Sequence, residues 1–195
     1  MNEPYEINRC VWAGSNPLYI SYHDNEWGFP VRDERMLFEF LILETFQAGL
    51  SWITILKKRD NFRKAFDNFE YEIVAKYDES KVESLMNDVG IIRNKLKINA
   101  ALSNAKAFIE VQNEFGSFEK YIWGFVDGKP IQNQCKTIGD IPPKTLLSDK
   151  LSKDLKKRGF KFVGSTIVYA YMQATGMVND HATDCFRYKE VAKLG

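Results

Sequence analysis

A single carboxylate, Glu44, stands where the surrounding pattern predicts an apolar side chain. On a helix it shares one stripe with Leu37, Leu41 and Ala48, at spacings of four, three and four residues. A carboxylate in such a place is costly to bury unless it is paired or hydrogen-bonded. One interpretation is a structural glutamate that an arginine or backbone amides satisfy. The other is an acid in a pocket, which would accept hydrogen bonds from a ligand with N–H donors or positive charge.

The residues after Glu44 favour a pocket. Gly49 interrupts the helical periodicity and Trp52 follows it, and a glycine-centred break beside a buried acid is a common way to line a cleft. Tyr19 and Tyr22, three residues apart, would add aromatic surface to it. The alternative for these aromatic residues is ordinary core packing, since Phe, Trp and Tyr make up 14% of the chain.

Two pairs of residues have the types and spacing of metal ligands. Cys10 and His23 are separated by twelve residues, whereas His181 and Cys185 stand four apart, so that on a helical turn both would face the same way. A tetrahedral Cys2His2 zinc site needs two such pairs. The alternative is a buried cysteine and two unrelated histidines, because the spacing matches no standard zinc finger. Three cysteines, with Cys135 as the third, do not suggest a disulfide framework.

A segment near residue 160 combines glycines with positive charge. Gly159 and Gly164 bracket a short turn between two expected helices, and the backbone N–H groups at the start of the second helix form a ready anion site. Such a hairpin would bind the DNA backbone without sequence preference, through Lys156, Lys157, Arg158, Lys161, Gly164 and Ser165. The alternative is an ordinary helix end, where Lys and Arg favour the terminus. A second basic group consists of Arg93, Lys95 and Lys97.

These candidates need helices to position them. Apolar residues recur at helical spacing after Asp33, which is the expected N-cap of the first long helix. The periodicity predicts further helices over residues 51–58, 60–66, 71–76, 80–86, 94–115, 146–158 and 165–175. No convincing alternating strand pattern occurs, so we predict an all-α fold.

Two regions lack sustained periodicity. Residues 1–31 contain three prolines and many aromatic residues, and we expect an extended arm that a metal ion would clip to the last helix. Residues 116–145 are expected to be irregular up to Pro142-Pro143, although 121–125 are apolar.

Composition sets further bounds. A chain of 195 residues with 45% apolar content suits one globular domain, or one domain with a small annex. Lys and Arg number 27 against 26 Asp and Glu, so any DNA contact must come from a local basic cluster. No stretch approaches the roughly 20 apolar residues that a membrane span requires. The polar start is not expected to be a signal peptide, and we expect a cytoplasmic protein.

Several motifs occur together along nearly the whole chain, from Cys10 to about Cys185. They are Arg9 to Trp12, Pro17 to Gly28, Gln47 to Trp52, Gly90 to Arg93, Lys156 to Gly164 and Val178 to His181. With these motifs the chain resembles bacterial 3-methyladenine DNA glycosylase I, of the helix-hairpin-helix DNA glycosylase superfamily.

The resemblance implies one helix-hairpin-helix glycosylase domain over residues 1–195. In it, one structural zinc ion would join the arm 1–31 to the segment 178–188, held by Cys10, His23, His181 and Cys185. The implied base pocket contains the catalytic Glu44 and the base-binding residues Tyr19, Tyr22 and Trp52. The loop that would enter the DNA stack where the base has left contains Gly49 and Leu50.

The implied activity is hydrolysis of the N-glycosidic bond of 3-methyladenine in alkylated double-stranded DNA, by a monofunctional enzyme that acts as a monomer. The usual catalytic aspartate of the superfamily is implied not to be used, although Asp180 lies near the corresponding stretch. One departure is Thr45-Phe46, where the family pattern predicts a smaller or polar pair, commonly ending in Gln; Phe46 is therefore a candidate for reshaping the pocket wall.

Three alternatives remain from the residues. One is a related alkylbase glycosylase with altered specificity, and another is a zinc-stabilised DNA-binding module without catalysis. A zinc hydrolase is disfavoured, because four protein ligands leave no open position on the metal.

Overall fold

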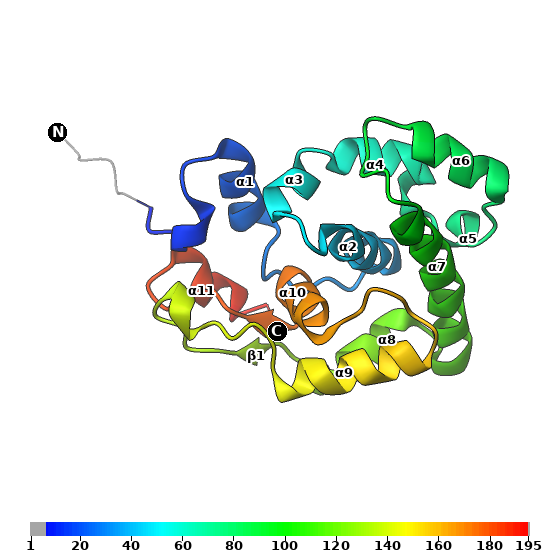
Figure 1. The fold of residues 1–195 in the computed structure, drawn as a ribbon. Helices are drawn as coiled ribbons and strands as arrows, with labels where there is room; N and C mark the ends of the chain where they lie inside the picture. Colours follow the sequence, from blue (N-terminus) through cyan, green and yellow to red (C-terminus); the bar gives the residue numbers. More distant parts are fainter. Residues whose placement is uncertain (1–6, 195) are drawn as a thin grey trace.

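Helices supply nearly all the regular structure of residues 7–194, the part of the chain that the computed structural model describes (Figure 1). In chain order the elements are η1 (Val11–Ala13), α1 (Pro17–Asn25), α2 (Glu34–Gln47), α3 (Trp52–Leu56), α4 (Arg59–Ala65), η2 (Asp67–Phe69), α5 (Tyr71–Val74), α6 (Glu79–Asn87), α7 (Lys95–Phe115), α8 (Phe118–Trp123), η3 (Gly124–Val126), β1 (Ile131–Gln132), η4 (Ile138–Asp140), α9 (Leu146–Lys157), α10 (Ser165–Ala174), β2 (Val178–Asn179) and α11 (Phe186–Val191). The predicted all-α class is confirmed, with one two-residue parallel pairing, β1 to β2, as the exception.

Helix α2 lies at the centre of this arrangement. It packs against α7, α10, α3 and α8, and every residue from 37 to 46 is buried. Figure 1 shows it surrounded by other helices. The apolar stripe that contains Glu44 is therefore part of a helix that is buried on all sides. Any polar side chain on this helix is costly to bury unless it is paired or hydrogen-bonded.

Local sequence signals fix the main helix boundaries. The Asp33 carboxylate accepts a hydrogen bond from the Met36 N–H at 2.8 Å, so the predicted N-cap of α2 is confirmed. Asn94 caps α7 in the same way, through the Lys97 N–H at 3.1 Å. Helix α9 ends before Gly159, whose φ of 94° is in the left-handed region, as the sequence predicts.

Three expectations about local structure were wrong. The arm is not extended, because Asn16 caps a helix, α1, with Pro17 in its first turn, where a missing N–H costs nothing. The segment expected to be irregular contains α8, which Ser117 caps. Finally, residues 181–185 are not helical, since α11 begins only at Phe186. Residues 1–6 of the predicted arm lie outside the described residues.

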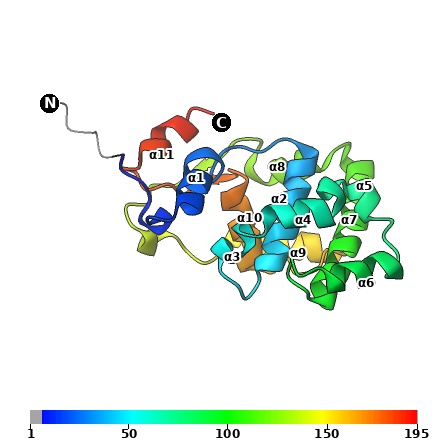
Figure 2. The ribbon, with the colours of Figure 1, turned by 90° about the horizontal axis from the view of Figure 1, so that it is seen from above.

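The two ends of the described chain meet at one end of the molecule. Figure 2 shows η1, α1 and α11 together there, whereas α4 to α7 lie at the opposite end and α2 and α10 lie between. Backbone contacts join the ends, because the Phe186 N–H donates to the Asn8 carbonyl at 3.0 Å. Among the described residues, no helix combines the length and the apolar character needed to cross a bilayer.

Candidate active site and metal-binding cluster

A cavity of about 270 Å³ opens at the C-terminal end of α2. Its walls come from the N-terminal region, α2, α3, η4 and α10, and they are mainly aromatic and apolar, as small-molecule sites usually are. The lining residues are Trp12, Tyr19, Tyr22, Trp27, Glu44, Gln47, Trp52, Ile138, Ile141, Ala170 and Gln173. The structure thus brings the four residues expected to hold the base, Glu44, Tyr19, Tyr22 and Trp52, to one cavity.

Helix α2 carries a second buried carboxylate, Glu39, which is a structural residue. Its side chain is 1% exposed and accepts hydrogen bonds from Arg59 at 2.7 Å, Arg63 at 2.8 Å and Arg35 at 3.2 Å. Burial alone would raise the pKa of Glu39, but the arginines outweigh it and the pKa is lowered. Glu39 therefore has the paired arrangement that the sequence left open for Glu44.

Glu44 has the opposite surroundings. It is 3% exposed, and its Oε2 atom is buried without a hydrogen-bond partner in the described part of the chain. Burial raises the pKa of Glu44 to about 8. An unpaired acceptor at the edge of a cavity fits the pocket interpretation, because a ligand can supply the missing donors.

Aromatic rings surround this acceptor. The ring centroid of Trp12 lies 4.9 Å from that of Trp27 and 5.8 Å from that of Tyr19, both edge-on. The ring centroids of Tyr22 and Trp52 are 5.4 Å apart. The Tyr19 hydroxyl accepts a hydrogen bond from the Ile53 N–H at 3.1 Å, which ties α1 to the start of α3. The indole N–H groups of Trp12 and Trp52 are also buried without partners among the described residues.

Sequence reasoning missed several lining residues, including Trp12, Trp27 and Gln173. The Gln173 amide donates to Asp180 at 2.7 Å, and Tyr169 donates to the same carboxylate at 2.8 Å. Asp180 is thus fully engaged as a structural acceptor that holds Gln173 at the cavity wall. Trp12 could have been predicted from its position two residues after Cys10, because a metal ion bound at Cys10 would also fix the neighbouring residues.

Phe46, at which the sequence departs from the family pattern, does not line the cavity. Phe46 is fully buried on the other side of α2, where its ring lies 4.8 Å from that of Phe62 and 5.7 Å from that of Phe66. It is absent from the cavity lining. The expectation that Phe46 reshapes the pocket wall was therefore wrong.

Phe46→Leu is expected to lower the free energy of unfolding by about 1–2 kcal/mol, because a smaller side chain leaves a void among packed rings. The relative release of 3-methyladenine, 3-methylguanine and 7-methylguanine should stay within twofold of the wild type, since the cavity wall is unchanged. Chemical denaturation and chromatography of the released bases measure the two effects. A changed order of preference among the bases would show that Phe46 acts on the pocket after all.

The chain leaves the cavity through a tight turn. Ala48, with φ −48° and ψ 114°, and Gly49, with φ 80°, have the backbone angles of a type II turn, which needs a residue of positive φ at its third position. The Leu50 N–H closes it on the Gln47 carbonyl at 2.7 Å. Gly49 and Leu50 are both exposed, so the structure places them on the surface close to Gln47, which lines the cavity.

The predicted phosphate-binding hairpin joins α9 to α10. Lys156, Lys157 and Lys161 are exposed, and Gly164 precedes α10 without a side-chain cap, which leaves its first N–H groups available to an anion. Arg158 is less available, because it pairs with Asp154 and Glu114, both at 2.7 Å.

The second basic group does not form a surface patch. Arg93 is exposed, whereas Lys95 pairs with Glu79 at 3.0 Å. Lys97 is buried and turns its ammonium into the protein.

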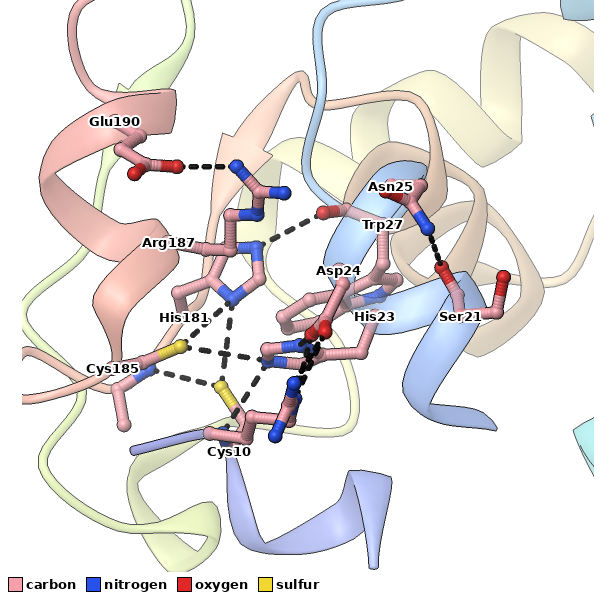
Figure 3. Close-up of polar contacts among 12 residues, drawn as sticks. Cys10, Ser21, His23, Asp24, Asn25, Trp27, His181, Cys185, Arg187 and Glu190 are labelled. Atoms are coloured by element: carbon pink, nitrogen blue, oxygen red, sulfur yellow. Dashed lines mark hydrogen bonds and ion pairs between the residues drawn. The ribbon is translucent and has the colours of Figure 1, made fainter. Parts of the chain in front are cut away.

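Cys10, His23, His181 and Cys185 meet where the two ends of the chain converge (Figure 3). Their ligand atoms lie within 4.8 Å of one another, and the Sγ–N distances from Cys10 to His181 and from Cys185 to both histidines are 3.5–3.6 Å. Zinc bonds of about 2.3 Å to sulfur and 2.0–2.1 Å to nitrogen in a tetrahedron place ligand atoms roughly 3.5 Å apart. The buried donor set therefore fits a metal ion with four protein ligands.

Neighbouring groups orient both histidine rings toward the centre of this cluster. His23 Nδ1 lies 2.7 Å from Asp24, which Arg9 holds in turn, and His181 Nε2 lies 2.9 Å from the Trp27 carbonyl (Figure 3). The other ring nitrogens are left for the metal, as is typical of histidine ligands. The interaction between the two thiols lowers the pKa of Cys185 and raises that of Cys10, so a metal ion with both as thiolate ligands would have to displace the proton that they share.

The fold and the cavity define a helical protein with a ligand-sized pocket, in which an unpaired acid lies among aromatic rings. Residues 12–188 match the family model described as methyladenine glycosylase. The chain belongs to this family.

Known proteins of the same family are close relatives. The chain is 50% identical to DNA-3-methyladenine glycosylase 1 of Escherichia coli K12, over 93% of this chain and 97% of that protein. It is 46% identical to DNA-3-methyladenine glycosylase of Haemophilus influenzae, over 91% and 96%. A crystal structure of a variant of 3-methyladenine DNA glycosylase I in complex with 3-methyladenine aligns with a TM-score of 0.89 and 37% identity, covering 92% of this chain and 97% of that one.

Proposed function

We propose that this chain is a DNA repair glycosylase that hydrolyses the N-glycosidic bond of 3-methyladenine in alkylated double-stranded DNA. The observation that carries the proposal is the buried, unpaired carboxylate of Glu44 in a cavity of aromatic side chains. The family and the relatives named for this activity support it, as does a related structure with 3-methyladenine bound. The chemistry of the damaged base explains why such a pocket suffices.

Adenine methylated at N3 carries a positive charge within DNA. Stacking on Tyr19, Tyr22 and Trp52 would be worth about 1–3 kcal/mol per base, with an added attraction between a cation and aromatic faces. Glu44 accepts hydrogen bonds from the N–H edge of the base and pairs with its charge. Extrusion from the duplex costs a few kcal/mol, and less for a damaged base.

Cleavage of the glycosidic bond needs no strong acid catalyst, because the methylated base is already a good leaving group. The C1′–N9 bond breaks with its electron pair going to N9, which neutralises the charge of the base, so no strong general acid is required. A water oxygen adds to C1′ and releases a proton, leaving an abasic site and free 3-methyladenine. Among the described residues no lysine lines the cavity, and the reaction that we propose is monofunctional, without a covalent intermediate.

The DNA contacts are proposed for two surface segments. Leu50, presented by the Gly49 turn, would fill the space that the extruded base leaves in the stack. The hairpin would hold the DNA backbone through Lys156, Lys157, Arg158, Lys161, Gly164 and Ser165. Since the net charge is only +1, this local cluster carries the electrostatic attraction.

One structural zinc ion is proposed for the cluster of Cys10, His23, His181 and Cys185. The ligand set is closed, so the ion would supply no reaction chemistry and would instead hold the arm beside the cavity. We further propose that the enzyme acts as a cytoplasmic monomer.

The decisive experiment incubates the protein with methylated duplex DNA and identifies the released bases. Release of 3-methyladenine, well above 3-methylguanine and 7-methylguanine, is the expected result. Binding of the duplex without release of any base would instead indicate a DNA-binding module. Comparable release of several bases would indicate a broader alkylbase glycosylase.

The pH dependence of base excision should follow the ionisation of the Glu44 carboxyl group. Its pKa of about 8 in the free protein means that only a minority of molecules carry the carboxylate at neutral pH. Because kcat/KM reports ionisations of the free enzyme, it should rise nearly tenfold per pH unit from pH 6 and level off above about pH 8. Initial rates at low DNA concentration measure it. A wild-type profile that is flat between pH 6 and 8 would contradict this role of the carboxylate.

A further inference from the structure

Helix α7 carries two buried polar side chains that the proposed reaction does not use. Lys97 is 6% exposed and Asn104 is fully buried. Seven residues apart, they lie almost two helical turns from each other, on the same side of the helix and roughly 10 Å apart along its axis. Figure 1 shows α7 beside both α2 and the loop that joins α9 to α10.

Lys97 binds the end of α2. Its Nζ donates to the Phe46 carbonyl at 2.8 Å and to the Ala48 carbonyl at 2.6 Å, and it has no ion pair in the described part of the chain. The last carbonyls of a helix have no partner within the helix, and a cation there is favourable. Lys97 therefore fixes the direction in which the chain leaves Glu44 and enters the Gly49 turn.

Asn104 binds the hairpin. Its amide nitrogen donates to the Lys161 carbonyl at 3.1 Å, and its amide oxygen accepts from the Lys161 N–H at 2.7 Å. One side chain thus satisfies both backbone groups of a single hairpin residue, which only an amide can do with this geometry. The next residue, Phe162, has a φ of 56°, a conformation that a non-glycine residue keeps only when its surroundings hold it there.

A third contact holds the hairpin from α9. The Ser152 hydroxyl, which is buried, donates to the Val163 carbonyl at 2.6 Å. The hairpin backbone between Gly159 and Gly164 is therefore tied on both sides before any DNA binds.

We propose that Lys97 and Asn104 are positioning residues, which set the turn 47–50 and the hairpin 159–164 at a fixed separation from one face of α7. The inference rests on the proposed function, in which these two segments contact DNA. A rigid duplex engages both segments at once only if their spacing is already correct. Neither residue lines the cavity, so the free base should bind without them.

The test uses Lys97→Met and Asn104→Leu, which keep the side-chain bulk and remove the hydrogen bonds. Two affinities are measured, one for duplex DNA with a tetrahydrofuran abasic-site analogue and one for free 3-methyladenine by tryptophan fluorescence. Each variant should raise the Kd for the duplex about tenfold or more and the KM for methylated DNA in parallel. The Kd for the free base should stay within twofold.

Matched controls are Lys95→Met and Lys106→Met, which alter exposed side chains of α7 that make no hydrogen bond to either segment within the described residues. Both should bind the duplex like the wild type. Lys97→Arg keeps a cationic donor and should restore much of the duplex affinity. If Asn104→Leu does not fold, Ser152→Ala loosens the same hairpin more gently and should weaken duplex binding in the same direction.

Hydrogen exchange separates positioning from general stability. Faster exchange should be confined to residues 47–51 in Lys97→Met and to 159–165 in Asn104→Leu. Unchanged duplex affinity in both variants, or equal losses for duplex and free base, would overturn the inference. A wild-type protein that binds the duplex but releases no base would overturn the proposed function instead, while the duplex affinities of the variants would still decide the inference.

Discussion

Glu44→Gln should lower the rate of 3-methyladenine release by roughly 10- to 100-fold, because a charge-assisted hydrogen bond worth about 1.5–3 kcal/mol is replaced by a neutral one. The amide keeps the shape of the side chain, so the cavity should persist. Single-turnover release from methylated duplex DNA measures the effect. The variant should also lose the rise of kcat/KM between pH 6 and 8, and full activity in Glu44→Gln would remove the role assigned to this residue.

The same substitution should stabilise the protein. The pKa of Glu44 is raised from 4.5 to about 8 in the folded state, so the folded state binds more protons than the unfolded state between these values. Burial of the group therefore becomes more unfavourable as pH rises from 4.5 to 8, and a glutamine there avoids this cost. We expect Glu44→Gln to unfold at a higher temperature than the wild type at pH 8, with a smaller difference at pH 5.

Glu39→Gln is the matched control on the same helix. Its carboxylate is paired, with a lowered pKa, so its loss removes the charge that the buried Arg59 shares with Glu26 and that also holds Arg35 and Arg63. Stability should fall at neutral pH, while kcat/KM should still rise between pH 6 and 8 through Glu44. A gain in stability for Glu44→Gln and a loss for Glu39→Gln would distinguish the acid of the pocket from the structural acid.

Removal of the metal should disrupt the cavity as well as the cluster. Purified, never-chelated protein should contain one zinc ion per chain, and stripping it should lower Tm by on the order of 10 °C. Base release should fall to background, because the arm that the metal holds carries Trp12, Tyr19, Tyr22 and Trp27 of the cavity wall. Elemental analysis, differential scanning calorimetry and base release measure these effects.

Cys185→Ser and Cys135→Ser form a matched pair for this prediction. Both cysteines are buried, but only Cys185 belongs to the four-residue cluster. Cys185→Ser should lose zinc and the metal-dependent part of Tm, whereas Cys135→Ser should keep both. A zinc content near zero in freshly prepared wild type would contradict the proposed site.

Local patterns predicted the fold class well, because helix periodicity and capping residues depend on near neighbours. Asp33 and Gly159 mark helix ends in the structure as they do in the sequence. Helix α1 escaped prediction because its apolar spacing is weak, and its packing against α3 comes from the tertiary fold.

The cavity was predictable only in part. Glu44 stood out on its stripe, yet Glu39 on the same helix is equally buried, and only the arrangement of distant arginines distinguishes them. Gln173 and Trp27 reach the cavity through long-range contacts that no spacing rule records. Similarly, His181 and Cys185 converge although no helix connects them, because the metal cluster depends on where the chain ends meet.

The joining of residues 10 and 181 also sets an order of events during synthesis. Cys10 leaves the ribosome early, but its partners His181 and Cys185 follow about 170 residues later, when the helical core has been made. The cavity wall that depends on the arm is therefore expected to assemble only after residues 181–185 have been translated. Its closure would act as a late maturation step, and a nascent chain that has not yet reached residue 181 is expected to be unable to capture a base.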